Sequence, residues 1–447
     1  MTFFKTDKQT LDDLNIFGRQ GSNSIYSIFN RCATRGGAAV LEEMFRYPLA
    51  NETSIKRRCG VIRYFSSLET PFPFPLASFD AIEPYLANTD ERTRISAQNR
   101  SIGTKLGNFI AVNTETSIIY QGITALAELL KTLYNFISSL NLSGDDGYYT
   151  EAREIVALLK DQVFHPVLNQ PEGKLAEETL SSYDGVFRFS HKDTVQKLLR
   201  YIYHLDVYLA AGKVARERKL CFPSLVASVD CTTIEGLYHP LVQNAVPNSV
   251  QIDGENNVIF LTGANMAGKS TFMKSLGIAM FLAHMGFPVA AKRMEFSVMD
   301  GIFTNINLPD NLSMGASHFY AEVLRLKKIA KELASGSKLF VVFDELFRGT
   351  NVKDAYEATL AITSAFSRKR NGMFIISTHI IEAGQVLREK HQNIRFIYLP
   401  TLMQGSEPVY TYRLEEGITD DRHGMLIINN ERIIEILEAG IKVPNNI

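Results

Sequence analysis

The chain of 447 residues is poor in cysteine, contains no long apolar run and carries almost no net charge. Its four cysteines, Cys32, Cys59, Cys221 and Cys231, are widely spaced and form no Cys/His cluster. This spacing argues against a zinc site and against a disulfide framework. We interpret the cysteines as free thiols in a reducing compartment, and a disulfide is the less favoured alternative.

Two further absences concern membranes and nucleic acids. No run approaches the roughly 18 apolar residues of a membrane helix, and the N-terminus lacks the apolar stretch of a signal peptide. We therefore predict a soluble, cytoplasmic protein without a membrane partner. The 47 basic and 48 acidic residues give a net charge of −1. Bulk charge thus gives no reason to expect DNA binding, which would have to use local patches.

The first half of the chain has the apolar periodicity of helices. Residues up to about 225 repeat apolar side chains at spacings of three and four, as in Val195, Leu198, Ile202, Leu205 and Leu209. This pattern predicts a helix that ends near Pro223. Further helices are predicted over residues 113–141 and 150–160.

The second half alternates short apolar runs with helical stretches. The runs cover residues 258–262, 339–343, 373–377 and 394–398. Fully apolar runs are typical of strands that are buried on both faces, and their alternation with helices indicates an α/β sheet. A helical first part is therefore expected to precede an α/β second part.

Residues 263–270 read Gly-Ala-Asn-Met-Ala-Gly-Lys-Ser and fit the pattern GxxxxGK[ST] between a predicted strand and a predicted helix. In such a loop the backbone N–H groups face phosphate oxygens, the lysine neutralises phosphate charge and the serine hydroxyl ligates Mg²⁺. We predict that a nucleotide is bound by Gly263, Ala264, Asn265, Met266, Ala267, Gly268, Lys269, Ser270 and Thr271.

Two acidic residues, Asp344 and Glu345, follow the predicted strand over residues 339–343. Asp344 would join Ser270 as a Mg²⁺ ligand at the carboxyl edge of the sheet, and Glu345 would orient or polarise the attacking water. The alternative is that both acids only cap the next helix.

The next strand along the chain ends in Ser377-Thr378-His379. His379 at this sheet edge could hydrogen-bond the γ-phosphate or the attacking water, although a lone histidine is often structural. The predicted catalytic residues are therefore Glu345, His379 and Lys269.

Residues 311–319 precede a predicted helix over 320–331 and contain Gly315 and Ser317. A glycine and a serine at a helix start form an anion-binding N-terminus, which could cap the γ-phosphate of a neighbouring subunit. An ordinary serine N-cap is the alternative.

Together these motifs resemble the ATPase domain of the MutS family, DNA mismatch-repair ATPases related to ABC-type ATPases. The likeness lies in residues 262–271, 344–350, 377–379 and 312–319. Tyr238-His-Pro-Leu-Val242 resembles the segment before that domain, and Gly286-Phe-Pro-Val-Ala290 the strand after its first helix. The resemblance implies an α/β P-loop (ABC-like) ATPase domain over residues 229–447, the cofactors ATP and Mg²⁺, and a homodimer in which Ser317 reaches the partner's nucleotide.

The resemblance extends more weakly to the first half. Residues 10–16, Gly36-Gly37 and residues 48–65 look like the start of the all-α MutS core or lever domain, and residues 205–223 look like its end. We therefore expect a helical core/lever domain over residues 1–228. DNA is an expected partner on the same ground.

Several departures from the family pattern bear on function. The mismatch-recognition, connector and clamp domains are not expected in this chain. The wedge motif Phe-x-Glu occurs only as Phe343-Asp-Glu345. Ala245 stands where an aromatic residue would stack on the base, a loss for which Tyr412 could compensate. Met314 and Ala316 replace the usual serine and arginine of the trans signature.

Two functions follow. The preferred one is a homodimeric, Mg²⁺-dependent ATPase that opens and closes its helical arms around DNA in mismatch repair or a related repair or recombination process. The alternative is a MutS-like ATPase switch whose arms hold a protein partner. The near-neutral net charge and the missing wedge motif favour a protein partner. Basic stretches such as Arg92-Thr-Arg94 leave DNA as an alternative partner. An ABC transporter ATPase is a distant third.

Overall fold

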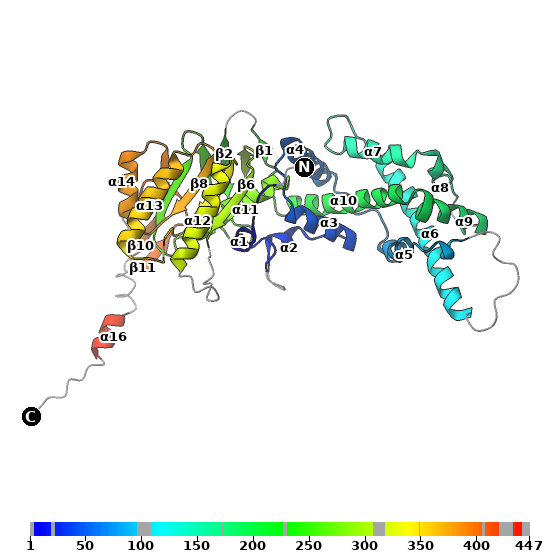
Figure 1. Cartoon of the computed structure of the whole chain (residues 1–447), viewed down its shortest axis with the longest axis horizontal. Coiled ribbons are helices and arrows are strands. Elements are labelled where there is room, and N and C mark those ends of the chain that lie inside the picture. The colour runs from blue at the N-terminus through cyan, green and yellow to red at the C-terminus, as the bar shows by residue number, and fades with distance from the viewer. Residues whose placement is uncertain are drawn as a thin grey trace, which may run out of the picture. The chain divides into compact units, whose positions relative to one another are not determined.

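The computed structural model describes residues 4–18, 23–95, 109–171, 173–226, 230–306, 318–347, 349–404, 407–419 and 432–439 (Figure 1). The chain folds into two compact units. The sheet unit comprises residues 1–27, 47–56 and 219–447, and the helical unit residues 28–46 and 57–218. This division differs from a single boundary after residue 228, because the first 27 residues belong with the second half of the chain.

Within the described residues the helical unit contains helices only. They are α3 (Arg35–Arg46), α4 (Glu52–Leu68, which begins in the sheet unit), α5 (Leu76–Ala87), η1 (Glu91–Thr93), α6 (Phe109–Ser139), α7 (Tyr149–Leu159), η2 (Gln162–Phe164), α8 (His165–Leu168), α9 (Glu177–Asp184), the π-helix η3 (Gly185–Ser190) and α10 (Lys192–Glu217). Helices α6 and α7 confirm the helices predicted over residues 113–141 and 150–160.

Helix α10 packs against α3, α7 and η3 of the helical unit. Its predicted apolar stripe is buried, with Val195, Leu198, Ile202 and Leu205 all at 0% exposure. Asp206 accepts hydrogen bonds from the backbone N–H groups of Ala33 and Thr34, each at 2.8 Å, just before α3 begins. The helix ends at Glu217, six residues before Pro223.

The sheet unit contains a six-stranded sheet in the order β12-β9-β4-β8-β7-β6. All neighbours are parallel except the edge pair β12 and β9. Its strands are β4 (Val258–Gly263), β6 (Gly301–Asn305), β7 (Leu339–Phe343), β8 (Gly372–Ser377), β9 (Ile394–Leu399) and β12 (Glu415–Glu416). The four strands predicted from apolar runs are therefore confirmed as β4, β7, β8 and β9.

Helices cover both faces of this sheet. One face packs against α12 (His318–Ala334), α13 (Val352–Ser367) and α14 (Ile381–Lys390), whose buried side chains share a core with Phe260, Val341 and Phe374. On the other face, Thr232 contacts Met280 of α11 (Lys269–His284) and Met373 of β8. Alternate residues of the central strands thus face opposite helical layers, which explains why their sequences are apolar throughout.

The remaining strands form two smaller sheets. A four-stranded sheet has the order β1-β5-β2-β3, and a hairpin pairs β10 with β11. Their bounds are β1 (Ser224–Leu225), β2 (Cys231–Leu237), β3 (Asn248–Asp253), β5 (Arg293–Phe296), β10 (Thr401–Gln404) and β11 (Glu407–Tyr410).

The prediction of a strand at residues 286–290 is wrong. Only Val289 makes a single bridge there, to Cys221, and the strand that follows α11 is β5. The apolar residues of this segment are instead buried in a turn, where Phe287 and Val289 are both at 0% exposure. Near the C-terminus, residues Ile433–Ala439 form helix α16. None of the described helices has the length and apolar character needed to cross a membrane.

Candidate nucleotide site

The loop between β4 and α11 turns sharply at two glycines. Gly263 has a φ of 145° and Gly268 a φ of 101°, which L side chains rarely adopt. A Cβ on Gly268 would also lie 3.1 Å from the ring of Tyr412. Gly268 is the N-cap of α11 and supplies no side-chain cap. The first N–H groups of α11 therefore remain available to an anion.

Lys269 opens α11 and is only 5% exposed. Its Nζ donates hydrogen bonds to the carbonyl oxygens of Gly263 (2.7 Å) and Ala264 (3.0 Å) and forms no ion pair with a described residue. Burial lowers the pKa of Lys269, and the charges of Asp344 and Glu345 oppose this effect. The ammonium group is thus a buried cation held near, but not paired with, the two acids.

Strands β7 and β8 bring Asp344 and Glu345 next to Ser377 and His379. Phe343 pairs with Ile376, so the residues that follow them meet at the same sheet edge. Ser377 Oγ donates a 2.6 Å hydrogen bond to Asp344 Oδ1 and accepts one of 3.0 Å from the Glu345 N–H. Ser377 therefore fixes both acids. The sequence motif contained this serine, but only the structure assigns it a role.

Glu345 and His379 form a direct contact. His379 Nε2 lies 2.6 Å from Glu345 Oε1, and their side chains are 41% and 21% exposed. Glu345 has a φ of 53°, in the left-handed region that non-glycine residues seldom occupy. Such strained conformations are concentrated at functional sites. The pair combines a carboxylate and an imidazole that remain accessible to solvent.

A cavity of about 550 Å³ adjoins the loop. Its lining includes Tyr238, Ala245, Gly268, Thr271 and Tyr412. Asn248 holds the Tyr412 segment, because its Nδ2 donates to the Tyr412 carbonyl (2.9 Å) and its Oδ1 accepts from the Leu414 N–H (2.8 Å). The volume lies within the roughly 300–1,000 Å³ of small-molecule sites. Ala245 and Tyr412, singled out by sequence, thus lie at one cavity.

The other predicted residues fall into two groups. Asn265, Met266 and Thr271 are exposed and Ser270 is partly exposed, all at the sheet edge beside Lys269. Gly315 and Ser317 lie outside the described residues, so their trans contact stays a prediction. Among the described residues no three His, Cys, Asp or Glu side chains group as a metal site. A Mg²⁺ ion here would need Ser270, Asp344 and ligands from the nucleotide.

Comparison with known proteins finds a similarity that covers most of the second half of the chain. Residues 259–441 match the family described as MutS domain V. The part of the chain that carries the candidate site is thus similar to MutS proteins. The DNA mismatch repair protein MutS of Fusobacterium nucleatum is 30% identical over 241 residues, 53% of this chain and 26% of that protein. MutS of Streptococcus suis is 28% identical over 310 residues, 66% of this chain and 34% of that protein.

The similarity to MutS covers only part of the length of these relatives. The matches span about a quarter to a third of the length of these curated relatives. MutS domain V begins at Ile259 in β4, so it contains the loop, both acids and the segment from Ser377 to His379. Ala245 and Asn248, which complete the cavity, precede it.

Proposed function

We propose that the sheet unit is a P-loop, ABC-like ATPase domain that binds and hydrolyses Mg²⁺-ATP. The observation that carries this proposal is the convergence of Lys269, Asp344, Glu345 and His379 on one sheet edge beside a cavity. Ligands of open α/β sheets bind at the carboxyl ends of the strands. The site lies within the region that matches MutS domain V, the ATPase domain of that family.

The residues fit the group they would hold. Within the described part of the chain the buried Lys269 ammonium has only backbone carbonyls as acceptors. The start of α11 has no side-chain cap and offers N–H donors, so both groups suit phosphate oxygens. Ser270 and Asp344 would hold Mg²⁺, which neutralises phosphate charge when bound. Glu345 orients or polarises the attacking water, and His379 holds Glu345 in place for that role. Tyr412 supplies the aromatic ring that stacks on the base, because Ala245 has no ring.

Hydrolysis by the purified chain tests this assignment. Wild type should release phosphate from ATP in the presence of Mg²⁺, and chelation of the metal should abolish the reaction. Glu345→Ala should remove hydrolysis while nucleotide binding persists. Glu357→Ala, which removes an exposed acid from α13, is the matched control. Unchanged hydrolysis after Glu345→Ala would overturn the catalytic assignment.

We also propose a homodimer whose helical units act as lever arms on DNA and move with the ATP cycle. The support is the relatives' description as DNA mismatch repair proteins. Gly315 and Ser317 would complete the partner's nucleotide site.

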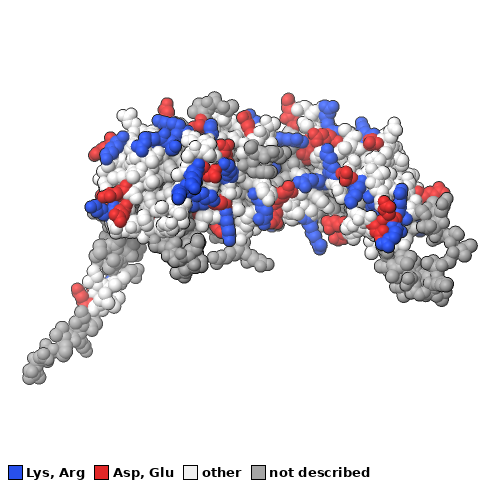
Figure 2. Space-filling model, viewed as in Figure 1, with Lys and Arg blue, Asp and Glu red and all other residues white. Residues whose placement is uncertain are grey.

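A protein partner in place of DNA is the second candidate. The observation that favours it is charge: the chain is close to neutral, and basic and acidic side chains are interspersed on the face in Figure 2. Salt titration separates the two, because phosphate contacts make log K fall steeply with log salt. Binding to duplex or branched DNA that weakens steeply with salt supports the DNA role. No binding at low salt favours the protein partner.

A further inference from the structure

The N-terminal residues are built into the edge of the six-stranded sheet. The Lys5 N–H donates to the Asp300 carbonyl (2.7 Å), and the Ile302 N–H donates to the Lys5 carbonyl (2.9 Å), so this segment pairs with β6. Helix α1 (Lys8–Asp13) follows at once and contacts the same strand. All these residues belong to the sheet unit.

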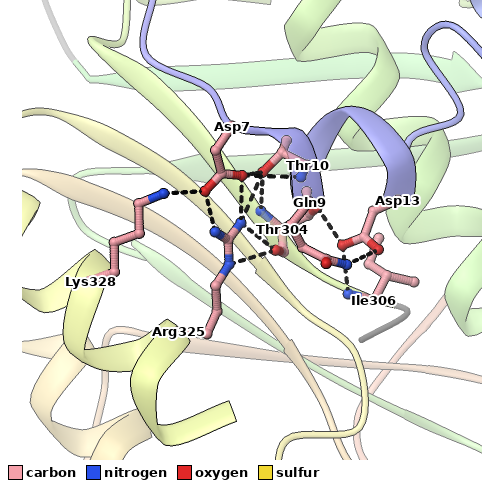
Figure 3. Close-up of polar contacts among 8 residues, drawn as sticks. All are labelled: Asp7, Gln9, Thr10, Asp13, Thr304, Ile306, Arg325 and Lys328. Atoms are coloured by element: carbon pink, nitrogen blue, oxygen red, sulfur yellow. Dashed lines mark hydrogen bonds and ion pairs between the residues drawn. The ribbon is translucent and has the colours of Figure 1, made fainter. Parts of the chain in front are cut away.

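Helix α1 binds the carboxyl end of β6 (Figure 3). The Thr304 N–H donates to Thr10 Oγ1 at 3.1 Å. Asp13 Oδ2 accepts from Thr304 Oγ1 (2.7 Å) and from the Ile306 N–H (2.9 Å). A side chain of α1 thus holds the end of β6 and the residue that follows it.

Helix α12, the next described element after β6, is held by the same helix. Arg325 lies two turns into α12, and its guanidinium forms an ion pair with Asp7, the N-cap residue of α1. Arg325 Nη2 also donates to Thr10 Oγ1 (3.0 Å) and to the Thr304 carbonyl (2.7 Å). Lys328, one turn further on, reaches Asp7 Oδ2 at 2.5 Å. Figure 3 shows both cations pointing from α12 towards Asp7.

This cluster is buried and specific. The Arg325 and Asp7 side chains are 7% and 17% exposed. A planar guanidinium with several fixed acceptors sets the position of a helix more closely than a single surface ion pair does. Removing one partner of a buried pair leaves the other charge uncompensated. Asp7 and Arg325 therefore fix where α12 begins relative to β6.

We propose that Asp7 and Arg325 are positioning residues for ATP hydrolysis. Asn305 lies between Thr304 and Ile306, which α1 holds, and its carbonyl accepts a 2.9 Å hydrogen bond from the N–H of Asp344, the proposed Mg²⁺ ligand. Asp7 and Arg325 hold α1 against this end of β6, so they position Asp344 at the candidate site. This inference rests on the proposed ATP hydrolysis.

The test measures turnover and ATP affinity separately in the full chain. Arg325→Met and Asp7→Asn should lower kcat by roughly tenfold or more, since small misplacements in a site are costly, while the Kd for ATP stays unchanged. Turnover is expressed per bound nucleotide, so loss of folded protein does not mimic the effect. The double variant should be no slower than the slower single variant, because both substitutions break one contact.

A second ion pair supplies the matched control. Lys5 Nζ lies 2.8 Å from Glu332 Oε2, so it also joins the N-terminal segment to α12, but near the far end of that helix and with side chains 48% and 32% exposed. Lys5→Ala and Glu332→Ala should keep wild-type kcat. If Arg325→Met does not fold, Arg325→Lys and Asp7→Asn carry the test, and Arg325→Lys should retain more turnover than Asp7→Asn.

The outcomes separate the two proposals. The positioning role is supported if wild type hydrolyses ATP, the Arg325 and Asp7 variants hydrolyse it slowly, and the Lys5 and Glu332 variants match wild type. If wild type hydrolyses ATP and all variants do so at the same rate, the positioning role is overturned and the ATPase assignment stands. The same holds if the Arg325 and Asp7 variants lose turnover and ATP affinity equally. A wild-type chain that hydrolyses no ATP overturns both.

Discussion

His379 Nε2 lies 2.6 Å from Glu345 Oε1, so residues from the ends of two neighbouring strands meet at the candidate site. Ser377 ties Glu345 and Asp344 to the same strand end through two hydrogen bonds. The acid that would act on water is therefore held by its backbone from one side and by an imidazole from the other. We therefore expect different residues to serve ATP binding and ATP hydrolysis.

His379→Ala should slow hydrolysis and leave ATP binding unchanged, because the imidazole contacts Glu345, which we propose acts on the attacking water. We expect kcat to fall roughly a hundredfold, as for loss of a positioned acid–base group. Steady-state hydrolysis and equilibrium binding of ATP measure the two effects. His391→Ala, whose imidazole contacts Ser364 instead, should behave as wild type. A loss of ATP affinity in His379→Ala would contradict the assignment.

Tyr412→Ala should weaken ATP binding, because the ring lines the cavity where the aromatic residue expected at Ala245 is missing. Stacking on a base contributes about 1–3 kcal/mol, so Kd should rise roughly tenfold. Tyr412→Phe keeps the aromatic face and should bind normally. Leu402→Ala removes an exposed apolar side chain of β10 and is the control. Equal affinity of Tyr412→Ala and wild type would place the base elsewhere.

Asp7 should stabilise the sheet unit except in acid. Burial alone would raise the pKa of this carboxyl, but hydrogen bonds from Arg325 and Lys328 and the charge of Arg325 lower it well below the ordinary 3.8. A lowered folded pKa gives stability that is complete above the unfolded value and is lost as pH falls below about 4. Urea unfolding from pH 7 to pH 3 should show this loss. Asp7→Asn should be less stable at pH 7 and lack this component of the acid dependence.

Glu151 should have the opposite effect in the helical unit. Burial raises its pKa from 4.5 to about 7, although the charge of Arg57 opposes the shift. A raised folded pKa means that stability is greatest below 4.5 and is lost as pH rises through 7. The stability of Glu151→Gln relative to wild type should therefore grow by about 3 kcal/mol from pH 4.5 to pH 8.

Glu128, an exposed residue of α6, provides the control for this effect. Glu128→Gln should shift stability little, and equally at both pH values. Urea midpoints followed by far-ultraviolet circular dichroism measure both variants. A constant difference between Glu151→Gln and wild type across this range would contradict the role of burial.

Local pattern was sufficient to predict the central strands and the sharp loop between β4 and α11. Strands β4, β7 and β8 are buried on both faces, so their sequences are apolar throughout and end in the polar residues that form the site. Because parallel strands end at one edge, the meeting of Asp344 with Ser377 and of Glu345 with His379 follows from the same pattern.

Contacts distant in sequence could not be predicted in this way. Nothing in the periodicity of residues 4–13 indicates that Lys5 pairs with β6 or that Asp7 binds Arg325. A helical pattern gives the buried face of a segment but not its partner. For this reason α1 was expected in the helical part and belongs to the sheet unit. The segment at residues 286–290 failed similarly, because its buried apolar residues pack in a turn.

Equilibrium binding of ATP to wild type and Lys269→Ala tests the central claim most directly. Loss of a charged hydrogen-bond donor should weaken binding roughly ten- to hundredfold. Lys292→Ala, which removes an exposed lysine before β5, should bind as wild type does. Equal affinity of wild type and Lys269→Ala for ATP, or no binding by wild type, would contradict the account.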